Sequence, residues 1–176
     1  GRIIKPENIP NEEDPDFLFT VKKEFPETQL PAVWLPHGIL GISNSEILQD
    51  DTEGKFGPFS GQLFVGDQGQ SKIMRVALEK VKGEYQGVVF GFREGFASGI
   101  LRLAWGNDHS LFAGMTSRGW SSTGQQMYSL ERLVWTGKMP FEMKTVRAMP
   151  DGFEIEYTLP VDKALAADPS SYKITG

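Results

Sequence analysis

The sequence predicts an all-β protein, on three observations. Glycine and proline are abundant, at 20 and 11 of 176 residues, and they stand between short apolar runs. Several of these runs alternate apolar with polar residues, the period of a strand with one buried face, and residues 153–159 are the clearest example. Turns recur at roughly 10–15 residues, the rhythm of sandwiches, barrels and propellers.

Residues 1–30 are rich in proline and acidic residues and are expected to form an extended connection. Short or alternating apolar runs separated by turns then predict seven strands. In chain order these cover residues 32–35, 62–66, 72–81, 87–92, 100–105, 111–115 and 127–135.

The pattern changes near residues 138–140. Strands are predicted at 141–149 and 153–159, joined by a Pro-Asp-Gly turn. One helical turn capped by Asp162 and a strand beginning at Ser171 should follow. The predicted organisation is therefore a connection at 1–30, a first β domain at 31–138 and the start of a second at 139–176.

Composition excludes several classes of protein. A formal net charge of −5 without a basic run argues against nucleic-acid binding. No stretch of 18 apolar residues predicts a membrane span, and the polar first residues are not a signal peptide, although both ends of the sequence read as cuts within a longer protein. The absence of cysteine removes disulfides, thiol catalysis and cysteine-ligated metals. No other metal-ligating pattern stands out.

Two phrases suggest an internal repeat. Residues 61–67 and 108–114 each contain Leu-Phe, a small residue and Gly beside a polar turn, and they lie about one propeller blade apart.

These phrases resemble a known family. PAVWLPHG at 31–38, GQLFVG at 61–66, IMRVAL at 73–78 and LRLAWGNDHSLF at 101–112 are similar to blade sequences of glucose/sorbosone dehydrogenase-like propellers. The resemblance covers residues 31–136. The whole chain also resembles part of large secreted bacterial proteins in which such a propeller is followed by further domains, often including a cytochrome c module.

The resemblance implies about two blades of a six-bladed β-propeller, followed by the start of an immunoglobulin-like β-sandwich, in a periplasmic or secreted protein. Relatives bind pyrroloquinoline quinone and calcium and oxidise a sugar hydroxyl or aldehyde. Their quinone is held by one Lys and two Arg, whose positions correspond here to Gly69, Gly99 and Leu101. The relatives' catalytic His would precede this chain, so no catalytic residue is assigned, and the fragment alone is expected to bind no cofactor.

Two functions therefore stay open. The first is part of a quinone-linked sugar or aldehyde dehydrogenase, with a cytochrome c module as partner in the parent chain. The second is a non-catalytic propeller that binds carbohydrate or protein, which the missing cations at Gly69, Gly99 and Leu101 favour.

Six residues are candidates for ligand binding. His37 in a loop is either a base or ligand contact, or a histidine bonded to the backbone. Asp67 and Gln68 follow a strand, where they either bond sugar hydroxyls or shape the turn. Arg102 either faces a central channel or pairs with a carboxylate between blades. Arg118 and Trp120 lie in a Gly/Ser loop, where Trp120 either stacks on a sugar or packs to anchor the loop.

Overall fold

The computed structural model describes residues 17–174, which belong to two compact units, Gly1–Ala32 and Val33–Gly176. The described part of the first unit contains the helix α1 (Phe17–Glu24). A helix there differs from the extended connection expected of residues 1–30, the first 16 of which lie outside the described residues. Leu18 and Val21 share one helical face, and the ammonium group of Lys22 stabilises the end of the segment by donating to the carbonyls of Pro26 and Thr28 (2.7 and 2.6 Å).

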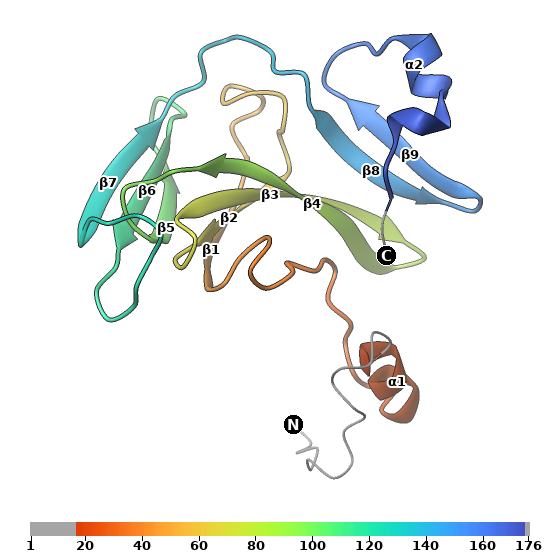
Figure 1. Ribbon diagram of the computed structural model, residues 1–176, viewed down its shortest axis with the longest axis horizontal. Coiled ribbons are helices and arrows are strands. Elements are labelled where there is room, and N and C mark those ends of the chain that lie inside the picture. The colour runs from red at the N-terminus through yellow and green to blue at the C-terminus, as the bar shows by residue number, and fades with distance from the viewer. Residues whose placement is uncertain (1–16, 175–176) are drawn as a thin grey trace. The chain divides into compact units, whose positions relative to one another are not determined.

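The second unit is built from three antiparallel sheets, so the fold is mostly β, as the sequence predicts (Figure 1). In the first two sheets, consecutive strands are neighbours. The four-stranded sheet contains β1 (Asn44–Gln49), β2 (Leu63–Asp67), β3 (Lys72–Val81) and β4 (Glu84–Glu94). The three-stranded sheet contains β5 (Ile100–Trp105), β6 (Leu111–Thr116) and β7 (Tyr128–Leu133).

The third sheet is a hairpin of β8 (Met143–Met149) and β9 (Gly152–Tyr157), and β8 lies against β3 and β4. The helix α2 (Lys163–Ala167) and a 3-10 turn (Pro169–Ser171) follow. Asp162 caps α2 as predicted, because its carboxylate accepts from the amides of Ala164 and Leu165. A strand starting at Ser171 was wrong, because Ser171 closes the 3-10 turn. The boundary proposed near 138–140 stays a prediction.

The first strand was also misplaced. Residues 32–35 lie between two prolines and form no strand; Val33 and Leu35 instead pack on the face of the first sheet that carries Val65 and Met74. The sheet begins with β1, a polar segment that the sequence did not mark.

The main core fills the space between the first two sheets. Phe64 and Ile73 from the first sheet are fully buried against Ile100, Leu103 and other apolar residues of the second. Phe56 and Phe59, from the long β1–β2 loop, complete this core. Their burial explains why a loop of mixed sequence adopts a defined path.

The strands β1 and β5 join the two sheets. The hydroxyl of Ser45 donates to the carbonyl of Ile100 (2.7 Å), and the indole N–H of Trp105 donates to the carbonyl of Gln49 (2.8 Å). Since the early residues of both strands meet, and the late residues of both meet, β1 and β5 run side by side in the same direction. No helix among residues 17–174 is long and apolar enough to cross a membrane.

Candidate ligand-binding site at the loop end

Several connections gather at one end of the first two sheets. In the antiparallel register Asn44 pairs with Asp67 and Lys72 pairs with Glu94, so β1 begins where β2 ends and where β4 ends. Ser45 fixes the start of β5 at the same end. We call the segments 36–43, 67–71, 95–99 and 117–126 together the loop end.

Asp67 is the central anchor of the loop end. Its side chain is fully buried, with 0% exposure. One carboxylate oxygen accepts from the amides of Ile42 and Ser43 (2.8 and 2.7 Å), and the other accepts from the amide of Gln70 (2.6 Å). The carboxylate therefore organises the turn, and in addition ties it to segment 36–43. It is not presented to solvent.

Gln68 is buried and connects the two sheets. Its amide N–H donates to the carbonyl of Ser43 (2.8 Å), and its side-chain amide donates to the carbonyl of Thr116 at the end of β6 (3.1 Å). The backbone at Gly99 passes so close that a Cβ there would lie 2.3 Å from the Gln68 carbonyl oxygen. Gln68 is thus a structural bridge between the sheets.

The loop 117–126 is anchored at its base. The amides of Thr123 and Gly124 donate to the Gly69 carbonyl and the Ser71 hydroxyl (both 2.9 Å), and the amide of Gln126 donates to the Ala97 carbonyl (2.9 Å). Sequence reasoning missed Ser71, because a buried turn serine leaves no pattern that separates it from an exposed one.

The tip of that loop carries two of the candidates. Trp120 is 77% exposed, and the amide of Trp120 donates to the Ser117 carbonyl (3.2 Å). Arg118 is exposed, and its amide donates to the hydroxyl of Thr116 (3.0 Å). A largely exposed indole on a loop whose backbone is hydrogen-bonded is a surface on which a ligand can stack.

His37 lies in a second exposed turn of the loop end. A bridge pairs His37 with Gly41, and the Gly38 amide donates to the Gly41 carbonyl (2.7 Å). The side-chain amide of Gln70 and the ammonium of Lys72 hold this turn by donating to the carbonyls of Gly38 and Ile39 (both 2.6 Å). The imidazole of His37 is therefore presented to solvent on an ordered turn.

Arg102 lies apart from the loop tips, on β5. Its side chain is 70% exposed, and its guanidinium lies 3.6 Å from the carboxylate of Glu46 on β1. Arg102 therefore pairs with a carboxylate on the adjacent sheet, and whether that pair lies between propeller blades stays a prediction. The loop end thus gathers five of the six candidates, two of them as buried supports.

The residues present do not fit a quinone carrying several negative charges. A Cβ at Gly69 would lie 2.9 Å from the Cβ of Ile42, and Gly99 has even less room, so neither position takes a cationic side chain without rearrangement. Lys72 is the lysine closest in sequence to Gly69, and its ammonium already donates to the backbone carbonyl of Ile39. Within residues 17–174, no three acidic or histidine side chains converge as metal ligands.

Comparison with known proteins finds no family model, no curated protein and no solved structure that matches this chain. The structure shows a β protein of three antiparallel sheets, and no relative supplies a function for the loop end.

Proposed function

We propose that β1–β4 and β5–β7 are two successive blades of a β-propeller. Each is an antiparallel sheet of consecutive strands, and the first strands β1 and β5 lie side by side in the same direction. The connection from the last strand of the first sheet, β4, returns to β5 beside β1. A radial array of blades requires this return to the inner position.

The hairpin β8–β9 is, in this proposal, the start of a sandwich domain that follows the propeller. The parent protein is a periplasmic or secreted protein of the sugar dehydrogenase-like class, as the blade phrases at 61–78 and 101–112 suggest.

For the function, we propose that the loop end binds carbohydrate and that the described residues do not oxidise it. The observation that carries this proposal is the exposure of Trp120 on a loop whose base is fixed by hydrogen bonds to Gly69 and Ser71. A sugar ring has an apolar face that packs on an indole, and its hydroxyls find donors in a guanidinium such as that of Arg118.

The alternative, quinone-linked oxidation with calcium and a cytochrome c partner, follows from the resemblance alone. It requires cations that Gly69, Gly99 and Leu101 do not provide, so they would have to come from other parts of the parent protein. Carbohydrate binding without oxidation does not require cations at these positions.

The test is a titration of the chain with a panel of monosaccharides and oligosaccharides, followed by calorimetry on the best ligand. Trp120→Ala should weaken binding about tenfold, because stacking contributes about 1–1.5 kcal/mol. Trp120→Phe should retain part of the affinity, since it keeps a flat ring.

Tyr85→Ala is the matched control, because Tyr85 is an exposed aromatic residue on the β3–β4 hairpin, outside the loop end. Its binding should equal that of the unchanged chain. Sugar affinity that is the same in Trp120→Ala would refute the proposed site, and quinone-dependent oxidation of the sugar by this chain would favour the dehydrogenase alternative.

A further inference from the structure

A cavity of about 120 Å³ lies between the outer parts of the first two sheets. Its walls come from three places: the β1–β2 loop, the strand β4, and the segment 133–142, which begins with the last residue of β7. We call this cavity the wedge pocket. It shares no residue with the loop end.

The floor of the wedge pocket is aromatic. The buried rings of Phe56 and Phe59 lie 6.3 and 6.2 Å from the ring of Phe92, at tilted and perpendicular angles. These two contacts, one tilted and one edge-to-face, fix the rings, so the floor is a preformed apolar surface. A dry apolar cavity of roughly 150 Å³ is known to admit a benzene ring. The wedge pocket is somewhat smaller, but it is open to solvent, so an aromatic ring can enter it with its polar end outside.

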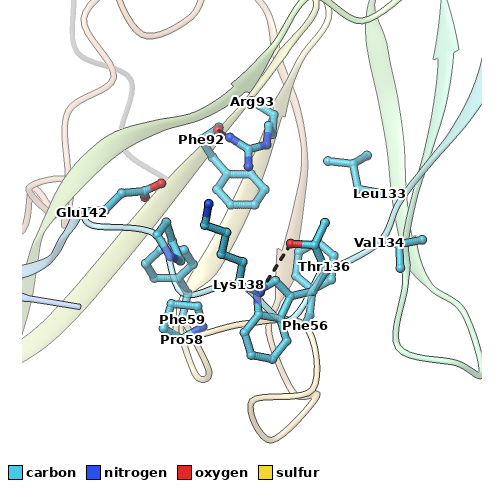
Figure 2. A pocket seen from close by; sticks show the side chains of 12 residues that line it. Phe56, Pro58, Phe59, Phe92, Arg93, Leu133, Val134, Thr136, Lys138 and Glu142 are labelled. Carbon is cyan, nitrogen blue, oxygen red and sulfur yellow. Dashed lines mark hydrogen bonds between the residues drawn. The ribbon is translucent and has the colours of Figure 1, made fainter. Parts of the chain in front are cut away.

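The mouth of the wedge pocket carries two cations. Figure 2 shows the Lys138 side chain extending between Glu142 and Phe92, on the side where the Arg93 guanidinium lies. Among the described residues, neither Lys138 nor Arg93 has a carboxylate within ion-pair distance. The only acid on the wall, Glu142, is itself within 3.9 Å of the buried Arg75. In a chain of net charge −5, this mouth is locally positive.

The wall also contains a donor without an acceptor. The indole N–H of Trp135 is buried and has no hydrogen-bond partner within residues 17–174. A buried donor is normally satisfied, and leaving one unpaired is unfavourable. Trp135 also lines the cavity, so a ligand oxygen that reaches its indole N–H would supply the missing acceptor.

We propose that the wedge pocket binds a small aromatic carboxylic acid in its ionised form. The ring lies on the phenylalanine floor, and the carboxylate lies between Arg93 and Lys138. Each part of the ligand matches one feature of the cavity. The flat ring packs on the phenylalanine rings, the negative charge pairs with the two cations, and a carboxylate oxygen provides an acceptor for Trp135.

The test uses the whole chain and three probes: benzoate, its uncharged analogue benzamide, and acetate, which has the charge but no ring. We expect benzoate to bind with a Kd on the order of 0.1–1 mM. Benzamide should bind at least tenfold more weakly, and acetate should show no saturable binding. Equal affinity for benzoate and benzamide would overturn the proposal, and so would the absence of saturable benzoate binding.

Variants locate the charge. Lys138→Met and Arg93→Met should each weaken benzoate binding about five- to tenfold without changing the fold of the chain. The control substitution Lys163→Met on α2 should leave the Kd for benzoate unchanged. Circular dichroism checks that each variant is folded. If both substitutions leave the Kd unchanged in a folded chain, the cations do not hold the ligand.

A spectroscopic readout places the ligand independently of affinity. In a nitrogen-15 labelled chain, the indole N–H signal of Trp135, assigned by its loss in Trp135→Phe, should shift on benzoate addition with the same midpoint as calorimetry. Thr136→Phe, which fills the mouth from an exposed position, should abolish that shift. A saturating shift at a different tryptophan would place benzoate elsewhere and contradict the proposal.

Discussion

The guanidinium of Arg75 on β3 donates a hydrogen bond to the backbone carbonyl of Met143, the first residue of β8 (2.7 Å). The same guanidinium donates to the carbonyl of Lys144 (2.9 Å), and it stacks between the rings of Phe59 and Phe90 at 3.9 and 4.4 Å. Arg75 is only 1% exposed. One buried cation therefore attaches the third sheet to the first.

We expect Arg75→Met to lower the free energy of unfolding by about 2–4 kcal/mol, because two carbonyls would lose their charged donor while the apolar contacts are largely kept. Arg75→Lys should lose nearly as much, since an ammonium cannot reproduce the planar fork. Urea unfolding measures both. Hydrogen exchange should accelerate first in β8 and β9.

Arg102→Met is the control for the loss of an arginine, because Arg102 is largely exposed and its pairing with Glu46 is a surface contact. Its effect should stay within about 0.5 kcal/mol. Equal effects of the two substitutions would show that Arg75 does not attach β8.

The β8–β9 hairpin also predicts a dependence on pH. The side chains of Lys144 and Arg147 donate to the carboxylate of Glu156 (3.0 and 2.9 Å), and these bonds lower the pKa of Glu156 below its ordinary value. A carboxyl group with a lowered pKa in the folded state stabilises the fold above its unfolded pKa of about 4.3. That contribution is lost as the pH falls through the folded value.

Glu156→Gln should therefore make stability less dependent on pH below about pH 4.5, with the smallest difference from the unchanged chain at the lowest pH. Thermal unfolding between pH 3 and pH 7 measures the slope. Because these side chains are partly exposed to solvent, 1 M NaCl should shrink the difference. Parallel stability curves for variant and unchanged chain would exclude a role for this carboxylate.

The all-β class and several later strands could be predicted because their residues are apolar at strand spacing. The segment Lys72–Val81 alternates and pairs with both of its neighbours, and the turn at Gly83 closes a two-residue hairpin in which Lys82 also has positive φ. In such segments, local sequence and tertiary packing favour the same structure.

The strand β1 could not be predicted in this way, because its stability comes from distant partners. Its sequence, NSEILQ, has two apolar residues, and its Ser45 and Glu46 face Ile100 and Arg102 on another sheet. The candidate site at the loop end could not be predicted for the same reason. Asp67 and Gln68 were chosen as polar residues after a strand, but their bonding partners Ser43 and Thr116 are 24 and 48 residues away.

A substitution at Asp67 tests whether this residue stabilises the fold or contacts the ligand. Asp67→Asn keeps the shape but removes the charge and one acceptor oxygen, so amides of Ile42, Ser43 or Gln70 would lose a partner. We expect a loss of about 2–3 kcal/mol, or roughly 5–10 °C in Tm, without any sugar present.

Asp151→Asn, in the exposed turn between β8 and β9, is the matched control and should leave Tm within about 2 °C. An Asp67→Asn chain of unchanged Tm that fails to bind sugar would instead assign Asp67 to the ligand.

Substitutions at Gly99 test why this chain lacks the quinone-binding cations of the family that its sequence resembles. A Cβ at Gly99 would lie 2.3 Å from the carbonyl oxygen of Gln68, which is part of the backbone and cannot rotate away. Gly99→Ala should therefore cost about 2–4 kcal/mol in urea unfolding. Gly91→Ala on β4 meets no atom within 4 Å and should be neutral or stabilising by up to about 0.5 kcal/mol.

Gly99→Arg extends the test to chemistry. If the family's guanidinium had been lost by a simple substitution, restoring it would give a stable chain with new affinity for pyrroloquinoline quinone. The close approach of the two connections predicts a strongly destabilised chain instead, because the arginine displaces the backbone that joins the sheets. A stable, quinone-binding Gly99→Arg chain would show that the loop end is a degenerate cofactor site, whereas an unstable one means that its glycine is required by the packing of the two sheets.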